Sequence, residues 1–185
     1  MKRVIAFAAI LSLSSAAGLA AGHIRTGEVV AARQAAMKEM ARAAKTIAQM
    51  FEGKLAYDTV AFKRAAETIK MQSGGALVTA FPPGSFGGPS DAKAEIDKSR
   101  AEFDALARHL ETFASALSAA ADNAPDGITK SMRMGQGMLT GNSLLGKKPA
   151  GEAEADPSSM PAEHVFHLML QDCASCHAKF REQKQ

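Results

Sequence analysis

The stretch Cys173-Ala174-Ser175-Cys176-His177, close to the C-terminus, decides how the rest of the chain is interpreted. Two thiols three residues apart, with a histidine directly after the second, form the attachment signature of haem c. Each thiol adds across one vinyl group of the haem to give a thioether, and the histidine is the proximal ligand of the iron. On a helix the three side chains fall within an arc of about 100°, so one face holds them all. The motif therefore predicts one covalent haem c on Cys173 and Cys176, with His177 on the iron.

Two other uses of paired cysteines remain open from the motif alone. A redox pair of the thioredoxin type belongs near the start of a βαβ unit, and no strand pattern surrounds this one. A zinc site would need further ligands from scattered histidines, whereas zinc sites more often use paired ligand clusters. The chain has only these two cysteines, so no disulfide framework supports the fold and packing has to stabilise it.

The N-terminus has the pattern of an export signal. A basic start at residues 1–3 is followed by an almost wholly apolar run over residues 4–13 and by small residues over 14–22. The run is shorter than the roughly 20 residues of a membrane helix, although an uncleaved anchor is the alternative. We therefore expect residues 1–22 to be a cleaved signal peptide and residues 23–185 to form one periplasmic domain without a stable membrane span.

Charge and composition narrow the function classes. The chain carries 22 Lys and Arg against 19 Asp and Glu, a net charge of +3, which favours neither nucleic acid nor a polybasic membrane surface. No acid–base pair or activated nucleophile stands out, so we expect no enzyme. Lys179, Arg181 and Lys184 follow the haem motif and are candidates for a docking rim for an acidic redox partner protein. The alternative is a solvated helix end whose cations complement the helix dipole.

The spacing of apolar residues predicts four amphipathic helices joined by one short and two irregular connections. Asp58 is a candidate N-cap for the second helix, which we expect to turn Val60, Phe62 and Ile69 inward, and Pro161 suits the first turn of the last. The predicted helices run from about 27 to 51, 58 to 71, 93 to 122 and 161 onward.

The two irregular connections lie on either side of the third predicted helix. Residues 79–90 contain three prolines and three glycines and cannot form regular helix. Residues 123–160 are predicted to be a long surface insertion with a short helix. The expected fold class is all-α, an antiparallel four-helix bundle with the haem between facing helices.

Three features resemble the class II c-type cytochromes, the cytochrome c′ family. The haem motif lies near the C-terminus and continues into Phe180-Arg181, where the family has Tyr or Phe before Arg. The stretch 33–37, Arg-Gln-Ala-Ala-Met, resembles the family's Arg-Gln-x-x-(Leu/Met), and residues 81–88 resemble its Phe/Pro-Gly-rich loop. The resemblance covers most of residues 25–122 and 161–183. The chain departs from the family in its long third connection and in having no Trp.

The resemblance implies roles for two residues of the first helix. In the family, the residue at the Met37 position faces the far side of the iron: Leu leaves the iron five-coordinate and high-spin, whereas Met closes it as a low-spin centre. Met37 is therefore implied as the second axial ligand, and Arg33, one turn earlier, lies beside a haem propionate in the family. Periodicity alone leaves Met37 as a core residue like Met40, and Arg33 as a solvated charge.

These implications lead to an expected function. A thioether ligand favours ferrous iron and raises the reduction potential, so His177/Met37 ligation predicts a one-electron carrier of the low-spin, Met-ligated branch. The alternative is a high-spin, five-coordinate cytochrome c′ that binds NO or CO. A third hypothesis is an interaction module that uses residues 123–160. Bundles of this kind often pair through their first two helices, and the alanine-rich surface permits a homodimer.

Overall fold

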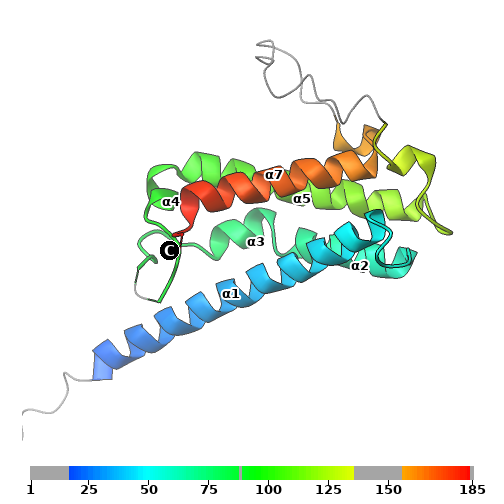
Figure 1. The fold of residues 1–185 in the computed structure, drawn as a ribbon. Helices are drawn as coiled ribbons and strands as arrows, with labels where there is room; N and C mark the ends of the chain where they lie inside the picture. The colour runs from blue at the N-terminus through cyan, green and yellow to red at the C-terminus, as the bar shows by residue number, and fades with distance from the viewer. Residues whose placement is uncertain (1–16, 88, 136–155, 184–185) are drawn as a thin grey trace, which may run out of the picture.

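The computed structural model describes residues 17–87, 89–135 and 156–183, and this part of the chain is helical with no strand (Figure 1). Four long helices make up the bundle: α1 (Ala17–Phe51), α2 (Thr59–Met71), α5 (Arg100–Asp122) and α7 (Ala162–Phe180). Shorter elements lie in the connections: α3 (Gly74–Thr79), α4 (Glu95–Lys98), and the 3-10 turns η1 (Lys130–Met132) and η2 (Pro157–Ser159). The predicted all-α, four-helix bundle is confirmed.

The larger of two hydrophobic clusters fills the end of the bundle where α1 turns into α2. All four long helices contribute to it, because each presents an apolar stripe at helical spacing. Burying one Ile, Leu or Phe side chain contributes roughly 1.5 to 3 kcal/mol, so this cluster supplies much of the stability. Its members with the lowest exposure are Ile47 and Met50 of α1, Phe62, Ala66 and Ile69 of α2, Ala114, Leu117 and Ala121 of α5, Ala124 just after α5, and Val165 and Met169 of α7.

The smaller cluster lies at the opposite end and is largely aromatic. Phe103 of α5 stands between Phe81 and Phe180, with ring centroids 5.4 Å away on each side and edge-on geometry. Leu77, Ile96 and Ala107 complete the cluster. It therefore joins the loop between α3 and α4 to the last residue of α7.

Two backbone hydrogen bonds fasten the C-terminal tail beside this aromatic cluster. The amide of Lys93 donates to the carbonyl of Phe180 (2.9 Å), and the amide of Glu182 donates to the carbonyl of Asp91 (2.7 Å). They flank an isolated antiparallel bridge between Ala92 and Arg181. The chain just before α4 and the chain just after α7 are thereby held side by side.

The predicted N-cap of α2 is confirmed, but the sequence prediction turned too many residues of this helix toward the bundle. The Asp58 carboxylate accepts from the amide of Ala61 (2.6 Å), as an N-cap should. Val60 and Met71 are 63% and 66% exposed, so the predicted inward position of Val60 was wrong. Each lies nine residues from a buried residue of α2, Ile69 or Phe62, and nine residues on a helix place a side chain on the opposite face.

Several boundaries also differ from the sequence prediction. Helix α1 begins ten residues earlier than expected, and residues 1–16 of the predicted signal peptide lie outside the described residues. Gly74 adopts a left-handed φ of 54° at the first residue of the unpredicted helix α3, two residues after the C-cap of α2, Gln72. A φ in this region favours glycine over any residue with a Cβ. The third predicted helix is interrupted at Ser99, which separates α4 from α5.

The start of the predicted insertion 123–160 packs on the bundle instead of leaving its surface. Met132 is 4% exposed in the larger cluster. Arg133 donates to the carbonyl of Phe51 at the end of α1 and to the Glu163 carboxylate of α7. Residues 136–155 lie outside the described residues. Among the helices that the structure does describe, none is both long and apolar enough to cross a membrane.

Candidate functional site

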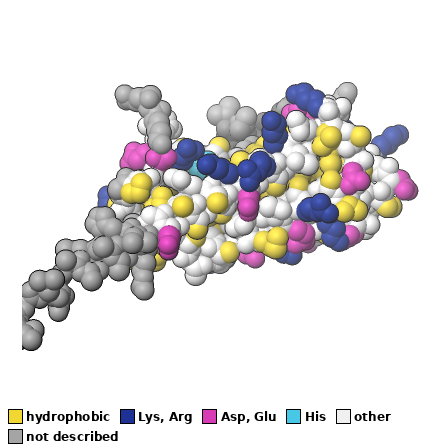
Figure 2. Space-filling view, turned by 90° about the horizontal axis from the view of Figure 1, so that it is seen from below, with side chains coloured by type: hydrophobic (Ala, Val, Ile, Leu, Met, Phe, Trp, Pro, Cys, Tyr) yellow, Lys and Arg dark blue, Asp and Glu magenta, His cyan; other side chains and the backbone are white. Residues whose placement is uncertain are grey.

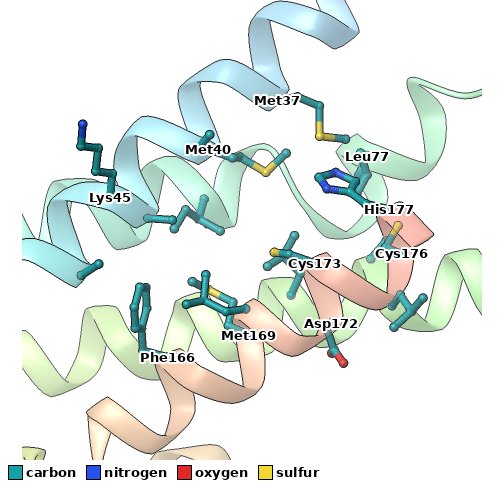
Figure 3. A pocket seen from close by; sticks show the side chains of 18 residues that line it. Met37, Met40, Lys45, Leu77, Phe166, Met169, Asp172, Cys173, Cys176 and His177 are labelled. Carbon is teal, nitrogen blue, oxygen red and sulfur yellow. The ribbon is translucent and has the colours of Figure 1, made fainter. Parts of the chain in front are cut away.

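Helix α7 presents the predicted attachment residues to a crevice between α7 and α1 (Figure 3). The crevice consists of two cavities of about 390 and 500 Å³ that share Met37, Ala41, Cys176 and His177 in their linings. Cys173 lines the first cavity, and both thiols are partly buried and free of any disulfide. The structure therefore brings Cys173, Cys176 and His177 together at one opening, as their spacing predicts.

Helix α1 supplies the opposite wall of the crevice with two methionines. The Met37 side chain points toward the His177 imidazole from across the crevice, and Met40 lies one turn further along the same helix (Figure 3). Met37 is partly buried, whereas Met40 is 8% exposed and belongs to the larger hydrophobic cluster. Met37 thus lies where a ligand opposite His177 would have to lie, and its ligation stays a prediction.

Leu77 of α3 completes this wall, and sequence reasoning missed it. It is 6% exposed and lines the first cavity together with His177 (Figure 3). Its position depends on α3, whose first two residues are glycines, a pair that usually marks a break in a helix. The apolar spacing within residues 74–79 is too short to have revealed a helix.

Burial sets the protonation states of the two thiols and the imidazole, and only that of the imidazole bears on iron binding. Burial, then the neighbouring Cys173 and then Asp172 raise the pKa of the Cys176 thiol to about 11. Burial, followed by Asp172, also raises the pKa of Cys173. Burial and the positive charge of Arg181 lower the pKa of His177. The imidazole is therefore neutral near pH 7, which is the form that binds a metal ion.

Arg33 fastens a loop instead of standing free in the crevice. Its guanidinium donates to the carbonyl oxygens of Ala80 and Ser85 and to the Ser85 hydroxyl, and lies 4.4 Å from the Phe81 ring centre. The residue is 5% exposed, and burial lowers the pKa of its side chain. It lines the second cavity, but three of its five N–H donors are used by the loop. The implied propionate contact remains a prediction, limited to the two remaining donors.

The residues present fit a covalent haem c. The second cavity contributes polar side chains such as Arg33 and Gln34. The first cavity places two thiols and an imidazole on one wall, two thioethers on the other, and an almost wholly apolar lining between them. Lys45 and Asp172 belong to that lining but point away from the methionines and His177 (Figure 3). An apolar slot with few, well-placed polar groups is what a macrocyclic cofactor requires. The fold and site together define a c-type haem protein of the four-helix-bundle class.

Comparison with protein families places the chain within that class. The family model described as Cytochrome C' matches residues 28–137, more than half of the chain, and the chain belongs to the cytochrome c′ family. The matched region contains Arg33 and Met37 and ends before the haem motif of α7. Proteins of this family are periplasmic, carry one covalently bound haem c and are often dimeric. This membership does not distinguish a low-spin, Met-ligated branch.

Solved structures support the fold. The ferric cytochrome c prime from Alcaligenes xylosoxidans aligns with a TM-score of 0.59 and 24% identity, covering 86% of this chain and 97% of that one. Cytochrome c′ from Thermochromatium tepidum gives 0.59 and 22%, covering 85% and 98%. Cytochrome c′ from Rhodopseudomonas palustris gives 0.55 and 26%, also covering 85% and 98%. The search of curated proteins found no match.

Proposed function

We propose that this protein is an exported monohaem cytochrome c′ that binds NO or CO on the Met37 side of a five-coordinate iron held by His177. Membership of a family known for NO and CO binding supports this proposal. A further structural neighbour is a nitric oxide complex of a cytochrome c prime mutant from Alcaligenes xylosoxidans, at 23% identity and a TM-score of 0.59, covering 86% of this chain and 97% of that one. The protein binds its ligand without transforming it, so we expect no enzyme activity.

The observation that carries the proposal is the apolar wall opposite His177. Met37, Met40 and Leu77 offer no N–H or O–H group to a diatomic ligand. Bound O₂ draws negative charge and needs a hydrogen-bond donor, whereas CO and NO bind without one, and distal polarity governs this choice in haem proteins. The wall therefore favours CO and NO over O₂.

Each residue of the site has a distinct role. When bound, the haem supplies the iron that takes up the gas. Cys173 and Cys176 would hold the macrocycle as thioethers, and the neutral His177 imidazole would bind the iron. Met37 lies across the crevice from His177 and would leave room there for a small apolar ligand.

A second candidate function depends on Met37 itself. Its side chain points toward His177 (Figure 3), so a bond from its sulfur to the iron would give a low-spin one-electron carrier. Such a protein would bind CO weakly, because the gas would have to displace a ligand.

Absorption spectra of the purified holoprotein distinguish the two functions, with Met37→Leu as the test variant and Met40→Leu as the matched control. For the gas-binding protein we expect a high-spin ferric spectrum, a CO adduct on reduction, and unchanged spin state in both variants. A far-red Fe(III)–thioether band that disappears only in Met37→Leu would establish the electron carrier instead. A colourless protein with no covalent haem mass would contradict both.

A further inference from the structure

Three basic side chains lie along one exposed face of α1. Lys38, Arg42 and Lys45 are four and three residues apart, so they share a stripe on the helix. Within the described part of the chain none of the three makes an ion pair, whereas Lys63, Lys70 and Lys98 on other faces each pair with a carboxylate. Figure 2, which looks at the molecule from the α1 side, shows Lys and Arg side chains gathered beside a histidine.

This basic stripe borders the crevice. Lys38 lines the second cavity, Lys45 lines the first, and Ala41 between them lines both. On the other side of the opening Arg181 of α7 lines the second cavity, and it is exposed and makes no ion pair among the described residues. Cations from both helices therefore surround the place where His177 remains accessible to solvent.

We infer that Lys38, Arg42, Lys45 and Arg181 form a docking surface for the acidic face of a protein that exchanges one electron with the haem. Unpaired cations raise the local potential, which steers an oppositely charged partner and increases its association rate. In the exchange the reduced partner loses one electron, ferric iron becomes ferrous, and no covalent bond changes. The inference depends on a covalent haem in the crevice, as the proposed function does, but not on the sixth ligand of the iron.

The structure assigns partner docking to a different set of basic residues from the set that the sequence suggested. The sequence suggested a rim of Lys179, Arg181 and Lys184. Lys179 pairs with Glu102 of α5, and Lys184 lies outside the described residues, so of the three only Arg181 is retained. The contribution of α1 becomes visible only once α1 is placed against α7.

A protein fits this surface better than an anionic membrane or a nucleic acid. The stripe holds three cations over about 10 Å of helix, fewer than the four to eight that mark a lipid-binding cluster. Glu39 lies next to the stripe, and Asp91 contributes to the lining of the second cavity, so the charge is not of one sign. The exposed Ala41 and the 37% exposed Leu170 provide the small apolar centre that a protein contact uses.

The test measures electron transfer to the ferric holoprotein from a reduced plant-type two-iron ferredoxin, used as an acidic protein donor, by stopped flow at several salt concentrations. The test variant is the charge reversal Lys38→Glu, Arg42→Glu, Lys45→Glu. The matched control, Lys54→Glu, Arg64→Glu, Lys130→Glu, changes two Lys and one Arg at exposed positions away from the crevice. A neutral quinol serves as a donor that is insensitive to charge.

We expect the wild-type rate with ferredoxin to fall at least about tenfold as salt rises from low to physiological strength. At low salt the crevice variant should be slower by at least about tenfold, the control variant by less than about threefold, and the quinol rate should be unchanged in both. Equal slowing in both triple variants would overturn the inference, because net charge alone would then act.

Two further results would also overturn it. A changed haem spectrum or reduction potential in the crevice variant would assign the cations to the cofactor. An unchanged ferredoxin rate, together with lost binding to phosphatidylglycerol vesicles, would assign them to a lipid surface. CO and NO binding is measured on the same samples, so that a failure of gas binding can be distinguished from a failure of partner docking.

Discussion

The two ends of the bundle are held together in different ways, and α1 takes part in both. Around Ile47 and Met50 it is buried among three other helices, with 0% and 2% exposure. Around Met37 one side of the same helix faces the crevice, and Arg33 connects it to the loop at Ala80 and Ser85. The packed end is therefore stabilised by buried area, and the crevice end by a few directional contacts.

Because of this difference, one end of α1 contributes mainly to stability and the other end mainly to the cofactor site. A large hydrophobic cluster loses several kcal/mol when one side chain is truncated, but its shape has little influence on a cofactor elsewhere. The hydrogen bonds of the crevice end instead fix α1 against the loop at Ala80 and Ser85, beside the cavity that Arg33 lines. We therefore expect substitutions at the packed end to alter stability alone, and substitutions at the crevice end to alter the haem spectrum too.

The largest effect should come from removing the covalent attachment. In Cys173→Ala/Cys176→Ala we expect almost complete loss of covalent haem, because neither thioether can form. The apoprotein should exchange its amide hydrogens faster over residues 30–41 than over residues 44–51, since only the latter keep their packing. Mass spectrometry detects the haem and the local exchange, and Ser175→Ala is the control that keeps both thiols. Equal exchange in the two halves of α1 would contradict the comparison.

The next effect concerns the packed end. Phe62→Ala should lower the free energy of unfolding by about 3 to 5 kcal/mol, because its ring is fully buried. Val60→Ala, at a 63% exposed position of the same helix, should change it by less than about 0.5 kcal/mol. Urea unfolding measures both values, and neither variant should change the haem spectrum. A spectral change in Phe62→Ala would show that the two ends are coupled.

A smaller effect is expected from removing the hydrogen bonds between Arg33 and the loop at Ala80 and Ser85. Arg33→Met keeps an unbranched apolar stem but leaves acceptors at Ala80 and Ser85 without their donor, at a cost of about 2 to 3 kcal/mol. The haem spectrum or CO affinity should also shift, because Met37 lies one turn further along α1. Lys38→Met, at an exposed position, is the control for loss of a positive charge. Lowered stability with an unchanged spectrum would limit Arg33 to a structural role.

The smallest effect is on the pH dependence of the free energy of unfolding, which should differ between the apoprotein and the holoprotein. The folded Cys176 thiol has a pKa of about 11, against about 8.5 for an unfolded thiol. Below pH 8.5 both states are protonated and stability is at its full value. As pH rises toward 11 the unfolded thiol ionises first, so the apoprotein loses stability over that range. The holoprotein should lack this decline, because its sulfurs are thioethers. Urea titrations at pH 8 and 10.5 measure the difference.

The parts of the fold that depend on local chemistry could be predicted from the sequence. The haem motif, the Asp58 cap and the four long helices all follow from neighbouring residues. The glycines at 74 and 75 favour the end of the second helix, but they do not reveal α3, which begins at Gly74 and packs against α5. Val60 was misplaced because valine is apolar in any setting, whereas its exposure depends on which face of α2 meets the bundle.

The site shows the same limit. The spacing of Cys173, Cys176 and His177 predicts their roles, because covalent attachment requires those residue types in that order. The engagement of Arg33 by Ala80 and Ser85, and of Lys179 by Glu102, joins residues far apart in sequence, and no local pattern encodes such partners. For the same reason Leu77, Lys38 and Lys45 emerged as crevice residues only in three dimensions.

The bridge between Ala92 and Arg181 has a consequence for the order of folding. It joins two segments separated by almost half of the chain, and contacts across long loops form late because closing the loop is entropically costly. The end of α7 should therefore dock onto its loop after the bundle has assembled. Until then the loop before α4 does not restrain the end of α7, which carries the haem motif.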